Sequence, residues 1–271
     1  MLLNLIYLIS ALLGCGLWAL SGKLWLLPLG ALAGFVVCVL ACVLLVWLLS
    51  RKVDPTAEQE GDDPLIRTIA KLYAPAVFRI LGCRIHTQGA EKLPVDGRYL
   101  LVCNHINDLD PGIPLTVFPN AQLAFISKKE NLDKPILGPL MLKIQCQLLD
   151  RENDRAALKT ILKCIAILKA DQANIAVFPE GGIIKDGKLL HDFRPGVFKI
   201  AQKAGVPIVV CTLQGTREIL KNVKKLRRTD VHFHLLEVIP AGELKGVTTT
   251  QIADRVHGIM AADLGAENVA G

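Results

Sequence analysis

The stretch "RYLLVCNHINDLDP" (residues 98–111) joins a short apolar run to a dense group of Asn, His and Asp side chains. The apolar part has the length and residue types of a buried β-strand. His105 and Asp110 lie five positions apart, and on a continuous helix this spacing would turn their side chains about 140° from each other. Pro111 disfavours helical geometry at Asp110, so the chain must turn, and a turn can bring the carboxylate back to the imidazole.

A His and Asp pair at the end of a strand suits general-base catalysis. A carboxylate that accepts from one ring nitrogen fixes the tautomer, and the other nitrogen can take a proton from a hydroxyl. Alternatives stay open from spacing alone. Asp followed by Pro is a common N-cap and first helical residue, Asp108 is a rival partner, and His105, Asp108 and Asp110 together would make a metal site with an unconvincing ligand set. Cys103 shares a strand face with His105, which suggests a Cys-His nucleophile pair or simply a buried thiol.

Short apolar runs and helical patterns continue to alternate along the chain. The runs "LAFIS" (123–127), "IAVFPE" (175–180) and "PIVVCTL" (207–213) read as strands, and "DRAALKTILKCIAILKA" (154–170) reads as an amphipathic helix. This alternation predicts an α/β domain with a largely parallel sheet flanked by helices. Ligands of such sheets lie beyond the carboxyl ends of the strands. The polar clusters to inspect are therefore "NHINDLD", "SKKE", "DREN" and "PEGG".

Residues 1–50 account for much of the 52% hydrophobic content, and Lys23 is their only charged residue. It divides two apolar runs of about 20 and 25 residues, each long enough to span a bilayer. We interpret residues 1–50 as a transmembrane helical hairpin and residues 51–271 as a second domain. Arg51 and Lys52 follow the second run directly, which places the second domain on the cytoplasmic side of the cell membrane.

Two other interpretations of the N-terminal segment are a cleaved signal peptide and a lipoprotein signal ending at Cys15. Both normally have basic residues ahead of a single apolar run, and no Lys or Arg precedes residue 23. After the hairpin, "LIRTIAKLYAPAVFRILG" (65–82) has helical spacing with Arg67 among apolar residues, a pattern typical of a helix at a membrane surface.

Charge and cysteine content narrow the class of protein. The net charge of +6 suits a domain held near anionic lipid, and no nucleic-acid-binding motif is present. The basic run at 221–228 is either a contact for lipid headgroups or a solvated face. The eight cysteines show no CxxC spacing, which indicates reduced thiols in a cytosolic compartment and neither a zinc site nor a disulfide framework.

Two motifs in order carry a resemblance to a known family. "NHINDLD" (104–110) is followed by "VFPEGG" (177–182), and this pairing of Asn-His-x4-Asp with Phe-Pro-Glu-Gly resembles the glycerolipid acyltransferases, above all the 1-acylglycerol-3-phosphate acyltransferases. The similarity covers roughly residues 85–220. It implies a glycerolipid-acyltransferase-like domain that moves a fatty acyl chain from an acyl thioester to the hydroxyl of a lysophosphatidic acid-type acceptor in phospholipid synthesis.

The resemblance also implies roles for individual residues. His105, oriented by Asp110, would be the general base. Glu180 would orient the glycerol-like part of the acceptor, with the Gly181 backbone close to it. Arg151 and Lys128 would hold the acceptor phosphate. The donor would be acyl-CoA or acyl carrier protein, with no cofactor and no metal.

One departure concerns the acceptor. The family usually continues Phe-Pro-Glu-Gly with Thr-Arg, whereas Gly182 and Ile183 stand here. A presumed phosphate-binding Arg is missing, and Lys185, Lys188 or Arg194 would have to replace it. Alternatives to the leading interpretation are a different lyso-lipid or glycerol-3-phosphate acceptor, a Cys103-dependent thioesterase, and an inactive lipid-binding relative.

Overall fold

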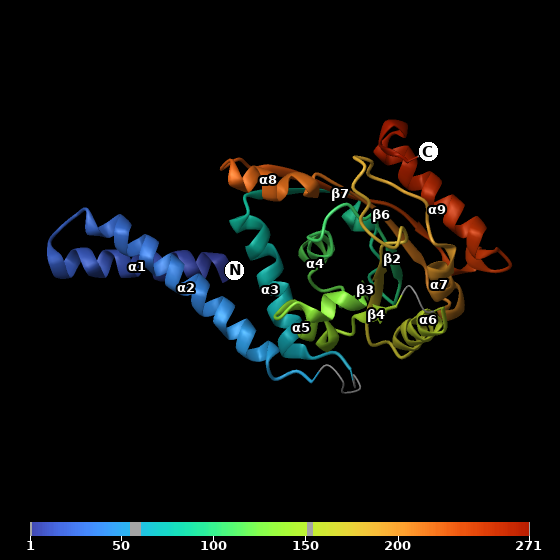
Figure 1. Ribbon diagram of the computed structural model, residues 1–271, viewed down its shortest axis with the longest axis horizontal. Helices are drawn as coiled ribbons and strands as arrows, with labels where there is room; N and C mark the ends of the chain where they lie inside the picture. Colours follow the sequence, from blue (N-terminus) through green and yellow to red (C-terminus); the bar gives the residue numbers. More distant parts are fainter. Residues whose placement is uncertain (1, 55–60, 151–153, 271) are drawn as a thin grey trace. The chain divides into compact units, whose positions relative to one another are not determined.

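The computed structural model describes residues 2–54, 61–150 and 154–270 and is shown in Figure 1. It divides into two compact units. One comprises Met1–Glu58 with Leu132–Leu140, and the other comprises Gln59–Asn131 with Met141–Gly271. The segment Leu132–Leu140 joins the first unit through contacts such as the Ser50 hydroxyl donating to the Pro135 carbonyl at 3.1 Å. The functional division after residue 50 remains a prediction.

The N-terminal unit contains two long apolar helices, α1 (Leu2–Ser21) and α2 (Leu26–Ser50). Both are long and apolar enough to cross a membrane, and only 22% and 11% of their most apolar windows is buried. A core helix of a soluble protein would be mostly buried, so this exposure suggests membrane association. The helices pack closely at Gly14, where a Cβ would lie 2.6 Å from the Leu27 carbonyl oxygen, so a larger residue would separate them.

The described residues of the second unit form a seven-stranded sheet in the order β1-β7-β6-β2-β5-β3-β4, and among these pairs only β6 and β7 are antiparallel. This confirms the predicted α/β class with a largely parallel sheet. The strands are β1 (Cys83–Gln88), β2 (Leu100–Val102), β3 (Leu123–Lys128), β4 (Gln147–Leu149), β5 (Asn174–Val177), β6 (Ile208–Gln214) and β7 (Thr229–Ile239).

Helices cover the sheet and build the core. Side chains of α6, α7 and α9 pack with β2, β5 and β6 around buried residues such as Ile175, Ile208 and Met260. At the other end of the unit α3 packs against α4, where Gly112 leaves room for the Phe78 ring. The helices that follow α2 along the chain are α3 (Pro64–Ile80), α4 (Gly112–Val117), α5 (Leu137–Lys143), α6 (Asp154–Lys169), α7 (Lys199–Ala204), α8 (Ile219–Lys224) and α9 (Thr249–Leu264).

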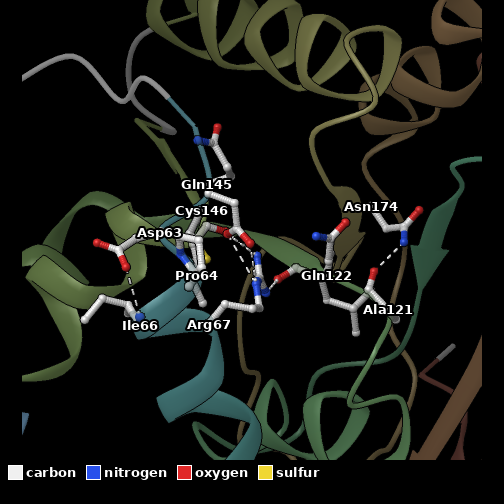
Figure 2. Close-up of polar contacts among 12 residues, drawn as sticks. Asp63, Pro64, Ile66, Arg67, Ala121, Gln122, Gln145, Cys146 and Asn174 are labelled. Carbon is white, nitrogen blue, oxygen red and sulfur yellow. Dashed lines mark hydrogen bonds and ion pairs between the residues drawn. The ribbon is translucent and has the colours of Figure 1, made fainter.

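Arg67 is held inside the unit by several polar contacts, and a position of α3 along a membrane surface remains a prediction. Its guanidinium pairs with Asp62 at 2.7 Å and donates to the carbonyls of Leu123 at 2.6 Å and Ile144 at 3.0 Å. Figure 2 shows this side chain at the start of α3, where Asp63 caps the helix. A guanidinium with several donors suits this arrangement, because it satisfies two carbonyls and a carboxylate at once. Arg67 therefore fastens the N-terminal end of α3 to the beginning of β3.

Candidate active site

The site lies at the edge of the sheet where the parallel strands β2, β5, β3 and β6 end. Because these neighbours run in the same direction, the segments that follow them meet at one edge. The segment after β2 carries His105 and Asp110, the segment after β5 carries Glu180, and the segment after β6 carries Thr216. Three distant parts of the chain thus contribute to one polar cluster.

The structure brings Asp110 back to His105, five positions earlier. Asp110 Oδ2 lies 2.9 Å from His105 Nδ1, and the carboxylate is completely buried. Residues 107–111 form a bend and turns before α4 begins at Gly112, so the chain does reverse where Pro111 disfavours a helix. This contact fixes which ring nitrogen holds the proton, because a carboxylate accepts and Nδ1 must then donate.

Asp110 accepts four hydrogen bonds, which explains how a carboxylate can be buried there. The backbone N–H groups of Ile106 and Asn107 donate to Oδ2 at 2.6 and 2.7 Å, in addition to the imidazole. The Thr216 hydroxyl donates to Oδ1 at 2.5 Å. A buried charge with this many donors is stabilised relative to an unpaired one. The carboxylate therefore keeps the turn and the imidazole in one fixed geometry.

The remaining nitrogen of His105 is available for chemistry. Within the described residues no hydrogen bond occupies Nε2, and 17% of the side chain is exposed. The ring stacks on Phe178, with 4.3 Å between ring centroids and 20° between planes. The Asp110 carboxylate holds one edge of the ring and Phe178 covers one face. Nε2 is thus left without a hydrogen bond to these neighbours. The arrangement can take a proton from a hydroxyl placed against Nε2.

Asn104 connects the end of β2 to β6 and to the segment after Gly181. Its side-chain amide donates to the carbonyls of Leu189 and Leu213, both at 2.9 Å, and its oxygen accepts from the Leu213 N–H at 2.7 Å. The residue is fully buried, so these three bonds satisfy it without solvent. Asn104 therefore fixes the end of β2, and with it the neighbouring His105, against Leu189 and Leu213.

Glu180 is buried beside His105. Its Oε2 accepts from the His105 backbone N–H at 2.6 Å, while Oε1 has no partner within the described residues. Burial raises the pKa of this carboxyl from 4.5 to about 9, although the hydrogen bond from His105 opposes the shift. The backbone N–H of His191 also opposes the shift, but burial is the larger effect and favours the neutral carboxyl. Contact of Glu180 with an acceptor remains a prediction.

Glu180→Gln should remove a pH dependence of stability. The folded protein keeps the Glu180 proton above pH 4.5 and the unfolded chain loses it, so the parent should lose stability as pH rises toward 9. Gln is neutral throughout this range. By about pH 9 the free energy of unfolding of the variant should therefore be roughly a few kcal/mol higher than that of the parent. Thermal unfolding of both proteins in detergent across this range measures the effect. Parallel curves for parent and variant would show that Glu180 is ionised when folded.

The loop after β5 brings Arg194 against Gly181. Gly181 has φ of 79°, and a Cβ there would lie 2.6 Å from Arg194 Nε, so any side chain at this position would strain the backbone and displace the guanidinium. The Arg194 backbone N–H also donates to the Pro179 carbonyl at 2.8 Å. A cation 13 positions further along the chain thus lies against the glycine of Phe-Pro-Glu-Gly, close to where the family's Thr-Arg would follow.

The other predicted residues fall in different places. Lys128 is exposed at the last position of β3, at the same edge of the sheet. Arg151 lies outside the described residues, as does most of the "DREN" cluster. Asp108 is exposed and makes no hydrogen bond or ion pair with His105 in the described part of the chain, and Cys103 is 1% exposed. Burial raises the pKa of the Cys103 thiol well above its usual range, which disfavours a nucleophilic thiolate.

Sequence reasoning missed Thr216 and Arg217, which follow β6. Thr216 holds Asp110, and Arg217 donates to the carbonyls of Ile184 and Lys188, so it supports the loop after Gly181. The strand-end argument that selected four polar clusters applies equally to "QGTRE" (214–218) and would have found both residues.

Comparisons with known proteins agree with this architecture. Residues 84–214 match the family model described as Acyltransferase. A chloroplastic 1-acyl-sn-glycerol-3-phosphate acyltransferase of Arabidopsis thaliana is 34% identical over 154 residues, which is 56% of this chain and 42% of the relative. A probable 1-acyl-sn-glycerol-3-phosphate acyltransferase of Mycoplasma pneumoniae is 29% identical over 165 residues, 57% of this chain and 61% of the relative. The chain thus spans about half the length of these relatives.

A solved structure shares the fold. The crystal structure of the 1-acyl-sn-glycerophosphate (LPA) acyltransferase from Thermotoga maritima aligns with a TM-score of 0.61 and 22% sequence identity, over 81% of this chain and 86% of that one. The family model spans both the His105 and the Glu180 motifs. Residues 84–214 therefore resemble an acyltransferase domain, and the relatives to which this chain is similar are named 1-acyl-sn-glycerol-3-phosphate acyltransferases.

Proposed function

We propose that this protein transfers a fatty acyl chain from an acyl thioester to the free hydroxyl of a lysophosphatidic acid-type acceptor, as a step of phospholipid synthesis. The observation that carries the proposal is the buried Asp110 carboxylate 2.9 Å from His105 Nδ1, inside a domain whose relatives are named for this reaction. The proposed co-substrate is acyl-CoA or acyl carrier protein.

The proposed mechanism is a single acyl transfer with His105 as the base. Nε2 takes the proton of the acceptor hydroxyl as the oxygen attacks the thioester carbonyl. The carbon–sulfur bond then breaks, the thiolate leaves, and the imidazolium returns the proton to sulfur, so that an ester and a thiol are formed. Asp110 stabilises the imidazolium while it holds the ring. No covalent intermediate with the protein is needed.

Acyl transfer from labelled donors to a panel of acceptors tests the function. Membranes containing the protein would receive acyl-CoA or acyl carrier protein donors together with lysophosphatidic acid, other lysophospholipids or glycerol-3-phosphate. We expect labelled product chiefly with lysophosphatidic acid. If the protein preferred another acceptor, the proposed acyl transfer would stand and the proposed acceptor would be wrong. Hydrolysis of the donor without transfer would favour a thioesterase.

Two alternatives receive less support from the site. A Cys103-dependent reaction needs an accessible thiolate, and Cys103 is buried with a raised pKa. An inactive lipid-binding relative would have no need of a base, yet the His105 ring, its buried carboxylate and the Asn104 support are all in place.

The acceptor clamp is a second part of the proposal, because a phosphate at the site needs paired cations. Arg151→Ala should weaken acceptor use by a few kcal/mol in kcat/KM, with the apparent donor affinity nearly unchanged. Arg194→Ala should show a smaller defect of the same kind. Lys245→Ala is the control, since Lys245 is exposed after β7 at the opposite edge of the sheet. The clamp would be refuted if the Arg151 variant acylated phosphorylated and unphosphorylated acceptors as efficiently as the parent does.

We propose further that α1 and α2 anchor the protein in the cell membrane, with the acyltransferase domain on the cytoplasmic side. The protein should then stay with membranes through a high-salt wash, because an apolar hairpin is held by burial rather than by screened charge. A reporter fused to the C-terminus should be found in the cytoplasm. Release by salt would argue against the anchor, and a reporter outside the cytoplasm would reverse the orientation.

A further inference from the structure

The turn after α8 presents an apolar side chain among cations. Leu226 is 97% exposed and has φ of 52°, a left-handed conformation that a leucine rarely adopts. Two backbone hydrogen bonds hold the turn, from Leu226 N–H to the Val223 carbonyl at 3.0 Å and from Arg227 N–H to the Asn222 carbonyl at 2.9 Å. The apolar side chain is therefore held in solvent by a closed turn.

The residues around Leu226 are all basic. Lys224, Lys225, Arg227 and Arg228 are exposed, and none of them has an ion pair with another described residue. By contrast, Lys221 on the same helix pairs with Glu218 at 2.8 Å. Four unpaired cations that surround one exposed leucine make a local surface with no acidic side chain of its own. We refer to residues 224–228 as the basic turn.

The C-terminal end of α3 lies beside the basic turn. The Thr229 N–H donates to the Gly82 carbonyl at 3.2 Å, and a Cβ on Gly82 would lie 3.9 Å from Arg228 Cα. Val77 and Ile80 in the last turn of α3 are 42% and 46% exposed. Figure 1 shows α8 near this end of α3. The basic turn thus adjoins further exposed apolar side chains.

The strand directions place this surface at the edge of the candidate active site. β7 begins at Thr229, directly after the basic turn, and runs antiparallel to β6 with Gln214 opposite His232. The start of β7 therefore lies at the carboxyl end of β6, where Thr216 contacts Asp110. β1 is parallel to β7, with Cys83 opposite Thr229, so the end of α3 reaches the same edge.

We propose that the basic turn, with Val77 and Ile80, is a docking surface for a membrane rich in anionic lipid. Leucine at such a tip enters the headgroup region while the surrounding Lys and Arg contact lipid phosphates. A protein partner is a poorer fit, because a few apolar side chains bury far less area than a specific protein interface. This contact is separate from α1 and α2, and it would turn the site edge toward the lipid that holds the acceptor. The inference rests on the membrane function proposed above.

Site-specific photocrosslinking in the full chain tests the surface. The photoreactive residue p-benzoylphenylalanine would replace Leu226, Val95 or Leu40 in three separate variants, each reconstituted in phosphatidylcholine vesicles with or without an equal share of phosphatidylglycerol. Val95 is the matched control, because it is 96% exposed in the loop that precedes β2, at the opposite edge. Leu40 is 61% exposed on α2 and reports on the anchor.

We expect position 226 to give lipid adducts by mass spectrometry, several-fold more with phosphatidylglycerol than without, and position 95 to give none. Replacing Lys224, Lys225, Arg227 and Arg228 by Gln should abolish the preference at position 226. Adducts at position 40 without adducts at position 226 would overturn the docking surface and leave the anchor intact. Adducts at neither position would overturn both, and adducts to a second copy of the chain would replace the lipid by a protein partner.

Discussion

His105→Ala should lower kcat by about 10²- to 10⁴-fold, the usual contribution of a general base, without unfolding the domain. The His105 side chain is partly exposed, and its loss leaves Asp110 with three other hydrogen bonds. Acyl transfer to lysophosphatidic acid, measured beside thermal unfolding of the same preparation, separates catalysis from folding.

Two control variants test whether the loss of activity is specific to His105. His86 lies 2.8 Å from Asp230, so it forms a similar His and Asp pair, but about half of each side chain is exposed and the pair lies on β1 and β7. His86→Ala should keep parental activity. Cys103→Ala should also keep most activity, since the thiol is buried. An active His105 variant together with an inactive Cys103 variant would exclude the proposed base and favour a nucleophilic mechanism.

The fold class and the meeting of the His105 and Glu180 segments at one sheet edge were both accessible from the sequence, for a physical reason. Apolar runs that alternate with helical patterns are typical of parallel sheets, and parallel strands bring the segments that follow them to one edge. His105 and Glu180 could therefore be expected to lie together although 75 residues separate them. That Glu180 contacts the His105 backbone N–H, however, depends on the conformation of the loop after Phe178, which spacing does not determine.

Other features depend on contacts between distant segments and were out of reach. The helical pattern of residues 65–82 placed Arg67 among apolar residues but could not show that Asp62 and the carbonyl of Leu123 would surround it. The contact between Arg194 and Gly181 likewise arises only when the loop after β5 folds back on itself. Thr216 was missed for a different reason, since the argument from strand ends was not applied to β6.

Asp110→Asn should remove the negative charge behind His105 while keeping every hydrogen bond. An amide oxygen at the Oδ2 position can still accept from His105 Nδ1 and from the N–H groups of Ile106 and Asn107. The amide nitrogen would then face the Thr216 hydroxyl, which can rotate to accept instead of donating. The fold should survive, and kcat should fall by about 10- to 1000-fold because the imidazolium loses its counter-charge.

Asp110→Ala is the informative companion, because it removes the acceptor as well as the charge. The buried N–H groups of Ile106 and Asn107 would lose their partner, and the domain should be destabilised by roughly 1–3 kcal/mol for each unsatisfied group. Thermal unfolding and kcat measured on both variants distinguish the two effects of the carboxylate. Asn at position 110 should give parental stability with low activity, and Ala should lower both. Parental activity in the Asn variant would show that Asp110 only shapes the turn, and His105 would then act without a charged partner.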